Sequence, residues 1–145
     1  MSNETRAART STPPTSSVRP RAIAVVAATV AALVVWGIGK AAGADLGVVL
    51  SKGEPKTEIG FVAIAVVGLF AALVGWGVLA LLEKFVPAKA LLIWTVLASA
   101  VTVLSLLPVL SAEASGGAKV TLALTHVAVA AVAIPLLRRS AAPSR

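Results

Sequence analysis

The feature that most constrains this chain is a set of four long apolar stretches without a single Asp, Glu, Lys or Arg. They cover residues 22–39, 59–82, 90–110 and 120–137. A helix needs about 20 residues, with about 17–25 tolerated, to cross the roughly 30 Å hydrocarbon core of a bilayer. Every backbone group in lipid must be hydrogen-bonded within the protein, which favours helices. We therefore predict an all-α fold, an antiparallel bundle of four transmembrane helices.

The composition excludes an ordinary water-soluble domain. Hydrophobic residues make up 58% of the chain and charged residues 13%, against about 45–50% and about 25% in soluble proteins. The net charge is +7, but the basic residues lie in the tails and between the apolar stretches. That distribution argues against nucleic acid as a partner and indicates contact with anionic lipid headgroups. With no cysteine, disulfides and cysteine-bound metals are excluded.

The remaining segments are polar and shorter. Residues 1–21 are rich in Ser, Thr, Pro and Arg, which predicts a disordered tail before a four-helix domain at 22–139. Residues 140–145 form a second short tail. The glycines of the segment 40–58 disfavour a continuous helix and allow a strand or hairpin at the membrane surface. Residues 115–117, Ser-Gly-Gly, predict a tight turn.

The distribution of Lys and Arg predicts the orientation. If the chain crosses the membrane four times, the two termini and the loop 83–89 share one side, which carries nine basic and two acidic residues. The opposite side carries four basic and four acidic residues. Loops facing the cytoplasm carry the excess of Lys and Arg. We therefore expect a multi-pass plasma membrane protein with both termini in the cytoplasm.

A secretory signal is the alternative interpretation of the first apolar stretch. Basic residues, an apolar run and the sequence Ala42-Gly43-Ala44 resemble a signal peptide with its cleavage site. The run has 18 residues, longer than the usual 7–15, and Lys40 lies just before the site. Cleavage would leave three helices and the same orientation for the rest of the chain.

His126 is the one ionisable residue well inside an apolar stretch. Such a residue is a functional-site hypothesis by default, and a histidine can carry protons near neutral pH. The structural interpretation is a neutral imidazole bonded to a neighbouring helix. Depths counted from the helix ends place Thr102 or Ser105 opposite it. We favour the structural interpretation, because no carboxylate lies inside any stretch to complete a proton relay.

Other polar and small residues mark candidate contact faces. The hydroxyls of Ser99, Thr102 and Ser105 recur every three residues and lie along one side of the third helix. Bundle interfaces use such hydroxyls, and a transport path would use them too. Gly68, Ala72 and Gly75 allow close helix approach, either within the bundle or in a homodimer.

The tryptophans differ in their expected depth. Trp36 and Trp94 fall within about a turn of helix ends, which is typical of the aromatic belt. Trp76 lies deeper, so its indole N–H needs a protein partner.

Several sequence elements together resemble a family of small four-helix actinobacterial membrane proteins without an assigned function. They are the run 31–36 (Ala-Ala-Leu-Val-Val-Trp), residues 42–46, the glycine-rich second helix ending at 81–85, residues 93–96, His126 and Ile134-Pro135. The resemblance spans about residues 21–139. It implies four spans and a bacterial plasma membrane, and it supplies no activity or catalytic residue.

We therefore expect a small accessory or structural membrane protein that acts through helix–helix contacts, alone, as a homo-oligomer or with another membrane protein. The alternative is a small transporter or channel component that uses the hydroxyl row and His126. An enzyme would need the acids Asp45, Glu54 and Glu58 gathered into one pocket. No phosphate loop, metal-spaced cluster or nucleophile motif is present in the sequence. We expect no cofactor and no catalytic activity.

Overall fold

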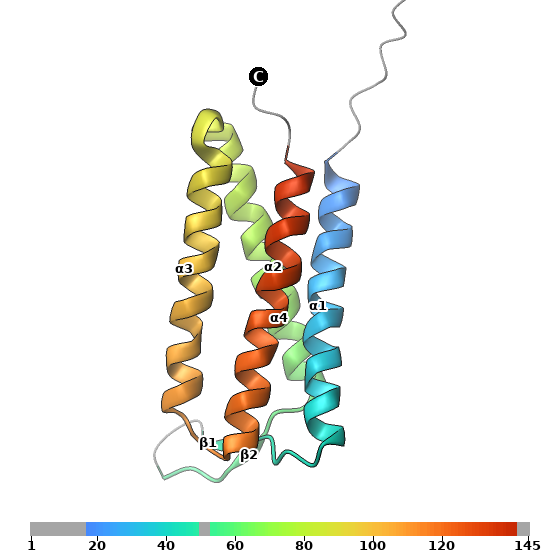
Figure 1. The fold of residues 1–145 in the computed structure, drawn as a ribbon, viewed down its shortest axis with the longest axis vertical. Coiled ribbons are helices and arrows are strands. Elements are labelled where there is room, and N and C mark those ends of the chain that lie inside the picture. Colours follow the sequence, from blue (N-terminus) through green and yellow to red (C-terminus); the bar gives the residue numbers. More distant parts are fainter. Residues whose placement is uncertain (1–16, 50–52, 142–145) are drawn as a thin grey trace, which may run out of the picture.

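The computed structural model describes residues 17–49 and 53–141. Within them, four long helices run up and down in one bundle (Figure 1). They are α1 (Val18–Ala41), α2 (Phe61–Phe85), α3 (Ala90–Ser111) and α4 (Gly116–Ser140). All four are long and apolar enough to cross a membrane. The predicted fold, a bundle of four transmembrane helices, is confirmed.

The helices extend past the apolar stretches that predicted them. α1 begins at Val18, so residues 18–21, which we expected in a disordered tail, are helical. The rest of that predicted tail, residues 1–16, lies outside the described residues, as do residues 142–145 of the second tail. α2 continues to Phe85, three residues beyond its apolar stretch. Polar residues that cannot enter the hydrocarbon can still continue a helix into the headgroup layer.

The helices form a ring in which α1 has the most extensive contacts. It packs against α4 and α2, and α4 packs against α3, whereas the contact between α2 and α3 is smaller. The face of α1 that packs inward carries Ala24, Ala28 and Ala32, each 0% exposed. These alanines recur every four residues, so they share one helix face and let the neighbouring helices approach closely.

Large apolar side chains cover the outside of the bundle. Val26 and Val34 on α1, Phe70 on α2 and Leu104 on α3 are each more than half exposed. Such a surface would be costly in water, whereas lipid tails accept it. The outer faces of the helices therefore suit a bilayer as their surroundings.

A small sheet joins the two loops at one end of the bundle. β1 (Gly47–Val49) pairs antiparallel with β2 (Thr57–Glu58) on one side and with β3 (Glu113–Ala114) on the other. β1 and β2 form the hairpin that the segment 40–58 allowed. No sequence pattern predicted β3, because two residues are too few for a pattern.

The expected tight turn at residues 115–117 is wrong. The side chain of Ser115 accepts a hydrogen bond from the backbone N–H of Ala118, at 3.0 Å, and so caps the start of α4. Gly116 and Gly117 form the first turn of that helix. A serine before a helix is a strong N-cap, which outweighs the turn preference of the two glycines.

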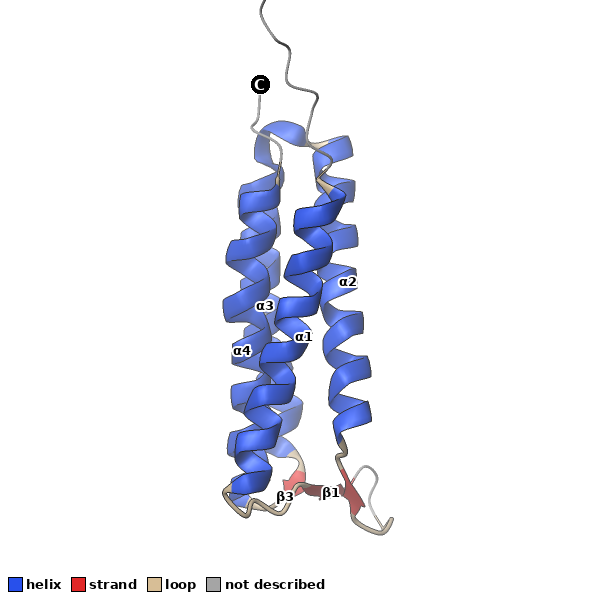
Figure 2. Cartoon of the chain, turned by 90° about the vertical axis from the view of Figure 1, so that its right-hand side faces the viewer, coloured by secondary structure: helices blue, strands red, loops and turns tan. Residues whose placement is uncertain are grey.

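The two ends of the bundle differ, and we name them by their contents. The sheet end carries β1, β2 and β3 (Figure 2). The terminal end carries the start of α1, the end of α4 and the link between α2 and α3, whose 3-10 turn η1 covers Pro87–Lys89. α2 and α3 meet at the terminal end and diverge toward the sheet end (Figures 1 and 2).

Candidate functional site

The divergence of α2 from α3 leaves a cleft in the bundle. The cleft is lined by α2, α3 and α4 and has a volume of about 440 Å³. Val67 of α2 and Val101 of α3 line it, yet they are 61% and 62% exposed. These two residues therefore form its rim, and the cleft opens sideways between α2 and α3. In a membrane, this opening faces the lipid.

Trp94 joins α2 and α3 on the side of the cleft nearer the terminal end. Its side chain is almost completely buried, and its Nε1 donates a hydrogen bond of 2.8 Å to the carbonyl oxygen of Gly75. The expectation that Trp94 belongs to an aromatic belt is therefore wrong. A residue one turn from a helix end can point inward as easily as outward, and the sequence does not indicate which.

His126 lies on α4 in the lining of the cleft. Its Nδ1 is 2.7 Å from the carbonyl oxygen of Leu122, one turn earlier on the same helix. The expected bond to Thr102 or Ser105 on the neighbouring helix is therefore not the bond that His126 makes. The carbonyl one turn earlier on the same helix lies within reach of this side chain, so the imidazole needs no partner from a neighbouring helix.

The hydroxyls of α3 divide between the cleft and the outer surface. Thr102 and Ser105 line the cleft, whereas Ser99 is exposed. Thr102 donates to the carbonyl oxygen of Ala98 at 2.8 Å, and Ser105 donates to that of Thr102 at 2.7 Å. Thr125 of α4 also lines the cleft and donates to Thr121 within its own helix, at 2.8 Å. These hydroxyls therefore donate their hydrogen bonds to carbonyls of their own helices and not across the cleft.

Trp76 is half-buried and packs beside the main cluster of buried residues. Among the described residues, its indole N–H has no hydrogen-bond partner. The partner that we expected for it is therefore not found in this part of the chain.

The small residues of α2 pack inside the bundle. A Cβ atom added to Gly68 would lie 3.6 Å from the Cβ of Ala32 on α1, an ordinary contact. Ala72 is 2% exposed. A Cβ on Gly75 would meet Leu137 at 3.9 Å and Trp94 at 4.0 Å. The structure therefore places all three residues against helices of the same chain.

A close approach of α1 to α4 occurs at a glycine that sequence reasoning missed. A Cβ atom added to Gly39 near the end of α1 would lie 2.4 Å from the Oγ1 and Cγ2 of Thr121 on α4. Gly37 is two residues away and would meet nothing within 4 Å. The sequence offers no means to tell these two glycines apart, because the difference depends on which face of α1 meets α4.

A buried ion pair joins α1 and α2 at the terminal end. The Nη2 of Arg21 lies 2.7 Å from both carboxylate oxygens of Glu83. Arg21 is 4% exposed, and its Nε has no hydrogen-bond partner among the described residues. Arg21 lies in the first turn of α1 and Glu83 in the last turn of α2. The start of a helix carries a partial positive charge and its end a partial negative charge, so each side chain lies at a helix end of like sign. The ion pair offsets both unfavourable positions.

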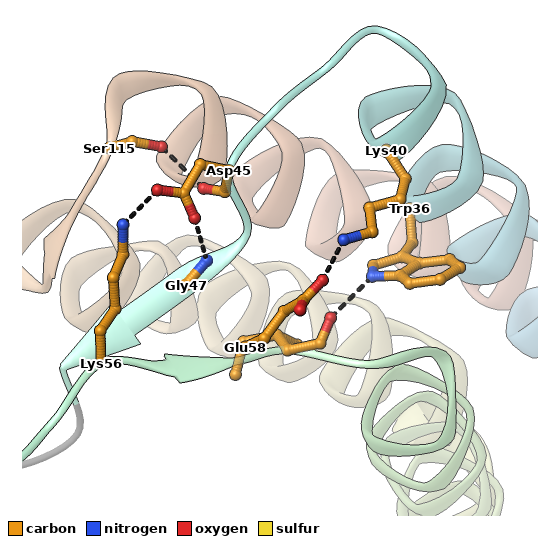
Figure 3. A network of polar contacts seen from close by, with 8 residues as sticks. Trp36, Lys40, Asp45, Gly47, Lys56, Glu58 and Ser115 are labelled. Atoms are coloured by element: carbon orange, nitrogen blue, oxygen red, sulfur yellow. Dashed lines mark hydrogen bonds and ion pairs between the residues drawn. The ribbon is translucent and has the colours of Figure 1, made fainter.

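The sheet end carries a network of polar contacts on its surface (Figure 3). Lys40 pairs with Glu58, and Lys56 pairs with Asp45. The Nε1 of Trp36 donates a hydrogen bond to the carbonyl oxygen of Ile59 at 2.8 Å. Ile59 directly follows β2, so this bond joins the end of α1 to the sheet.

Asp45 is the most connected acid of this network. Its side chain accepts hydrogen bonds from Lys56 and from the backbone N–H of Gly47, and these bonds lower the pKa of the Asp45 carboxyl below its ordinary value. Its backbone carbonyl accepts a bond of 2.8 Å from the hydroxyl of Ser115. Asp45 and Glu58 are both exposed and pair with different lysines. The acids of this loop are therefore not gathered into one pocket.

The described residues contain no group of three or more His, Cys, Asp or Glu side chains that could hold a metal ion. The polar groups of the cleft are a histidine and hydroxyls, which can exchange hydrogen bonds with a ligand. The arrangement can therefore bind a ligand through hydrogen bonds.

A comparison with known families matches residues 12–143 to a family described as of unknown function, DUF6069. No curated protein and no solved structure matches the chain. The match covers most of the chain, and it carries no activity with it.

Proposed function

The chain belongs to the DUF6069 family of unknown function, and from its geometry we propose an accessory protein of the bacterial plasma membrane that works through contacts inside the bilayer. The observation that carries the proposal is the cleft of about 440 Å³, which opens sideways between α2 and α3. Elsewhere, small residues let α1 pack closely against α2 and α4. Nearer the terminal end, the bond between Trp94 and Gly75 holds α2 and α3 together. The cleft is therefore the part of the bundle best suited to receive a component of the membrane.

The proposal includes an orientation in which the terminal end faces the cytoplasm. Lys84, Lys89, Arg138 and Arg139 lie at this end, at or just beyond the ends of the helices. At the sheet end, Lys40 and Lys56 are paired with acids. Among the described residues, Lys84, Lys89, Arg138 and Arg139 form no ion pair with an acid. An excess of Lys and Arg at one end supports a cytoplasmic position for that end.

Labelling of introduced cysteines in intact cells tests this orientation, because the chain has no cysteine of its own. Glu54→Cys lies in the exposed loop at the sheet end, and Ala88→Cys is exposed at the terminal end. A membrane-impermeant thiol reagent should label the first variant alone. Labelling of Ala88→Cys without Glu54→Cys would reverse the orientation.

The proposal does not include catalysis. An enzyme would need a cluster of reactive side chains, and two of the exposed acids at the sheet end, Asp45 and Glu58, are paired with separate lysines. In the cleft, the hydroxyls of Thr102, Ser105 and Thr125 are bonded to carbonyls of their own helices. Among the described residues, none of these hydroxyls donates a hydrogen bond to a basic side chain, as nucleophilic catalysis requires.

The alternative function, a small transporter or channel component, draws support from one observation. His126, Thr102 and Ser105 line the same cleft, as a transport path would require. Their hydrogen bonds run along their own helices rather than across the cleft. The opening lies between two helices and toward the lipid, which suits a binding site better than a path from one side of the membrane to the other.

Photo-crosslinking in cells tests the accessory function. A photoreactive amino acid would replace Val67 or Val101 at the rim and, as matched controls, Val26 or Val34 on the exposed face of α1, which does not line the cleft. We expect a discrete adduct, identified by mass spectrometry, from the rim positions and not from α1. Equal adducts at all four positions, or none at the rim, would contradict the proposal.

A further inference from the structure

The size of the cleft distinguishes between the two kinds of component that a bilayer offers, a helix and a lipid. The lining of the cleft runs along about four turns of α2, from Ile64 to Val78, and the cleft has a volume of about 440 Å³. The cleft is therefore long and narrow, whereas a helix is about 10 Å across. A volume in the range of about 300–1,000 Å³ suits a small apolar molecule. The cleft is therefore sized for a lipid.

The hydrogen-bonding groups in the cleft indicate what kind of lipid. A carbonyl oxygen can only accept, so the Nδ1 of His126 carries the proton that it shares with Leu122. In an uncharged ring, Nε2 is then an acceptor, and it has no partner among the described residues. Thr102, Ser105 and Thr125 have also donated their protons to their own helices. The cleft thus offers acceptors, and a ligand must bring a donor.

The depth of His126 limits where that donor can lie. His126 is six residues inside the apolar stretch 120–137, or about 9 Å along the helix at 1.5 Å per residue. This position lies well inside a hydrocarbon core about 30 Å thick. The headgroup of a phospholipid remains at the membrane surface and does not reach this depth. The donor must belong to a molecule that is apolar enough to bury it.

We propose that the cleft binds an uncharged lipid with a single hydroxyl group on an apolar body, and that this hydroxyl donates a hydrogen bond to Nε2 of His126. The apolar body would pass between Val67 and Val101 and lie along the small residues of α2. The inference rests on the proposed function in one respect, since both need the cleft to open into the bilayer.

A photoreactive lipid alcohol tests the inference. The full-length protein in nanodiscs would be labelled with a diazirine-bearing long-chain alcohol or with its methyl ether, which has the same apolar body and no donor. We expect the alcohol to label residues of α2, α3 and α4 in the cleft, and to do so more strongly than the ether. Equal labelling by the two probes would overturn the role of the hydroxyl.

Two substitutions at His126 locate the effect. His126→Leu removes the acceptor and should weaken alcohol labelling by about threefold to fifteenfold, the range expected for one hydrogen bond in a membrane protein. His126→Gln supplies an amide oxygen and should retain part of the preference for the alcohol. Labelling by the ether should be the same in all three proteins, which shows that the variants fold. An unchanged preference in His126→Leu would overturn the inference.

The outcomes separate this inference from the proposed function. If the crosslinkers at Val67 and Val101 trap a protein, including a second copy of this chain, and the alcohol shows no preference, the accessory function stands and the lipid inference fails. If neither probe labels the cleft and the rim gives no adduct, both fail.

Discussion

The two ends of the bundle use the same kind of interaction, an ion pair, in opposite surroundings. At the terminal end, Arg21 is buried to 96% and bonded to both oxygens of Glu83. At the sheet end, the side chains of Lys40 and Glu58 are 45% and 61% exposed. A buried charge without its partner is strongly destabilising, whereas an exposed pair is screened by water and contributes little.

This difference indicates how each end is held together. At the terminal end, the described polar connection between α1 and α2 is one pair of side chains, which adds to their apolar packing and depends on both partners. The sheet end is joined by backbone pairing of β1 with β2 and β3, and its ion pairs lie on the surface of that sheet (Figure 3). Loss of one surface charge leaves the backbone pairing in place.

The largest effect should follow from breaking the buried pair. Glu83→Gln leaves the Arg21 guanidinium buried without a countercharge and should lower the free energy of unfolding by about 3 kcal/mol. Glu58→Gln, the matched change at the sheet end, should cost no more than about 1 kcal/mol. Unfolding in detergent, followed by circular dichroism with increasing denaturant, measures both.

The double variant Arg21→Met/Glu83→Leu is the control for this prediction. Replacement of both charges by apolar side chains leaves no unpaired group, so it should recover most of the loss. A double variant as unstable as Glu83→Gln would show that the pair itself, and not the cost of an orphaned charge, stabilises the terminal end.

A smaller loss of stability should follow from disturbing the tight packing of α1 against α4 at the sheet end. Gly39→Ala would place a Cβ atom 2.4 Å from Thr121, and such overpacking typically costs about 1–3 kcal/mol. Gly37→Ala has open space around it and should leave stability unchanged or slightly raised. Melting temperatures of the two variants compare them directly.

The combination Gly39→Ala/Thr121→Ala should regain part of the loss, because it removes both atoms nearest to the added Cβ. Equal melting temperatures of Gly39→Ala and Gly37→Ala would show that α1 and α4 do not approach closely at Gly39.

The smallest effect concerns pH. The hydrogen bonds from Lys56 and Gly47 hold the pKa of the Asp45 carboxyl below its ordinary value, so the folded state binds fewer protons at this site than the unfolded state. The stabilisation is present above the ordinary pKa, near pH 4, and is lost as the pH falls through the lowered one. Thermal melting of the wild type and of Asp45→Asn on acidification should show a slightly steeper loss in the wild type.

Glu54→Gln is the matched control for this titration, because it removes an exposed acid from the same loop and leaves the bonds of Asp45 in place. The difference between the wild type and Asp45→Asn should shrink in high salt, because salt screens the exposed pair with Lys56 but not the bond from the backbone N–H of Gly47. A difference that salt leaves entirely unchanged would contradict a contribution from the Lys56 pair.

The cleft shows where prediction from sequence reached its limit. The sequence identified His126, Thr102 and Ser105 as residues of interest, and the structure brings these three into one cleft lining. It did not indicate that Ser99 would be exposed or that His126 would bond to Leu122 of its own helix. Both outcomes depend on how the helices pack against one another, which no local pattern encodes.

The sequence by itself determined the four spans, because length and hydropathy are local properties and a bilayer forces an apolar segment to become a helix. Tertiary structure alone decided which faces meet, since helices that are apolar nearly all round carry no preferred face. The fit of Gly39 against Thr121, the burial of Trp94 and the pairing of Arg21 with Glu83 follow from that choice. Shape and hydrogen bonding distinguish faces that hydrophobicity leaves equivalent.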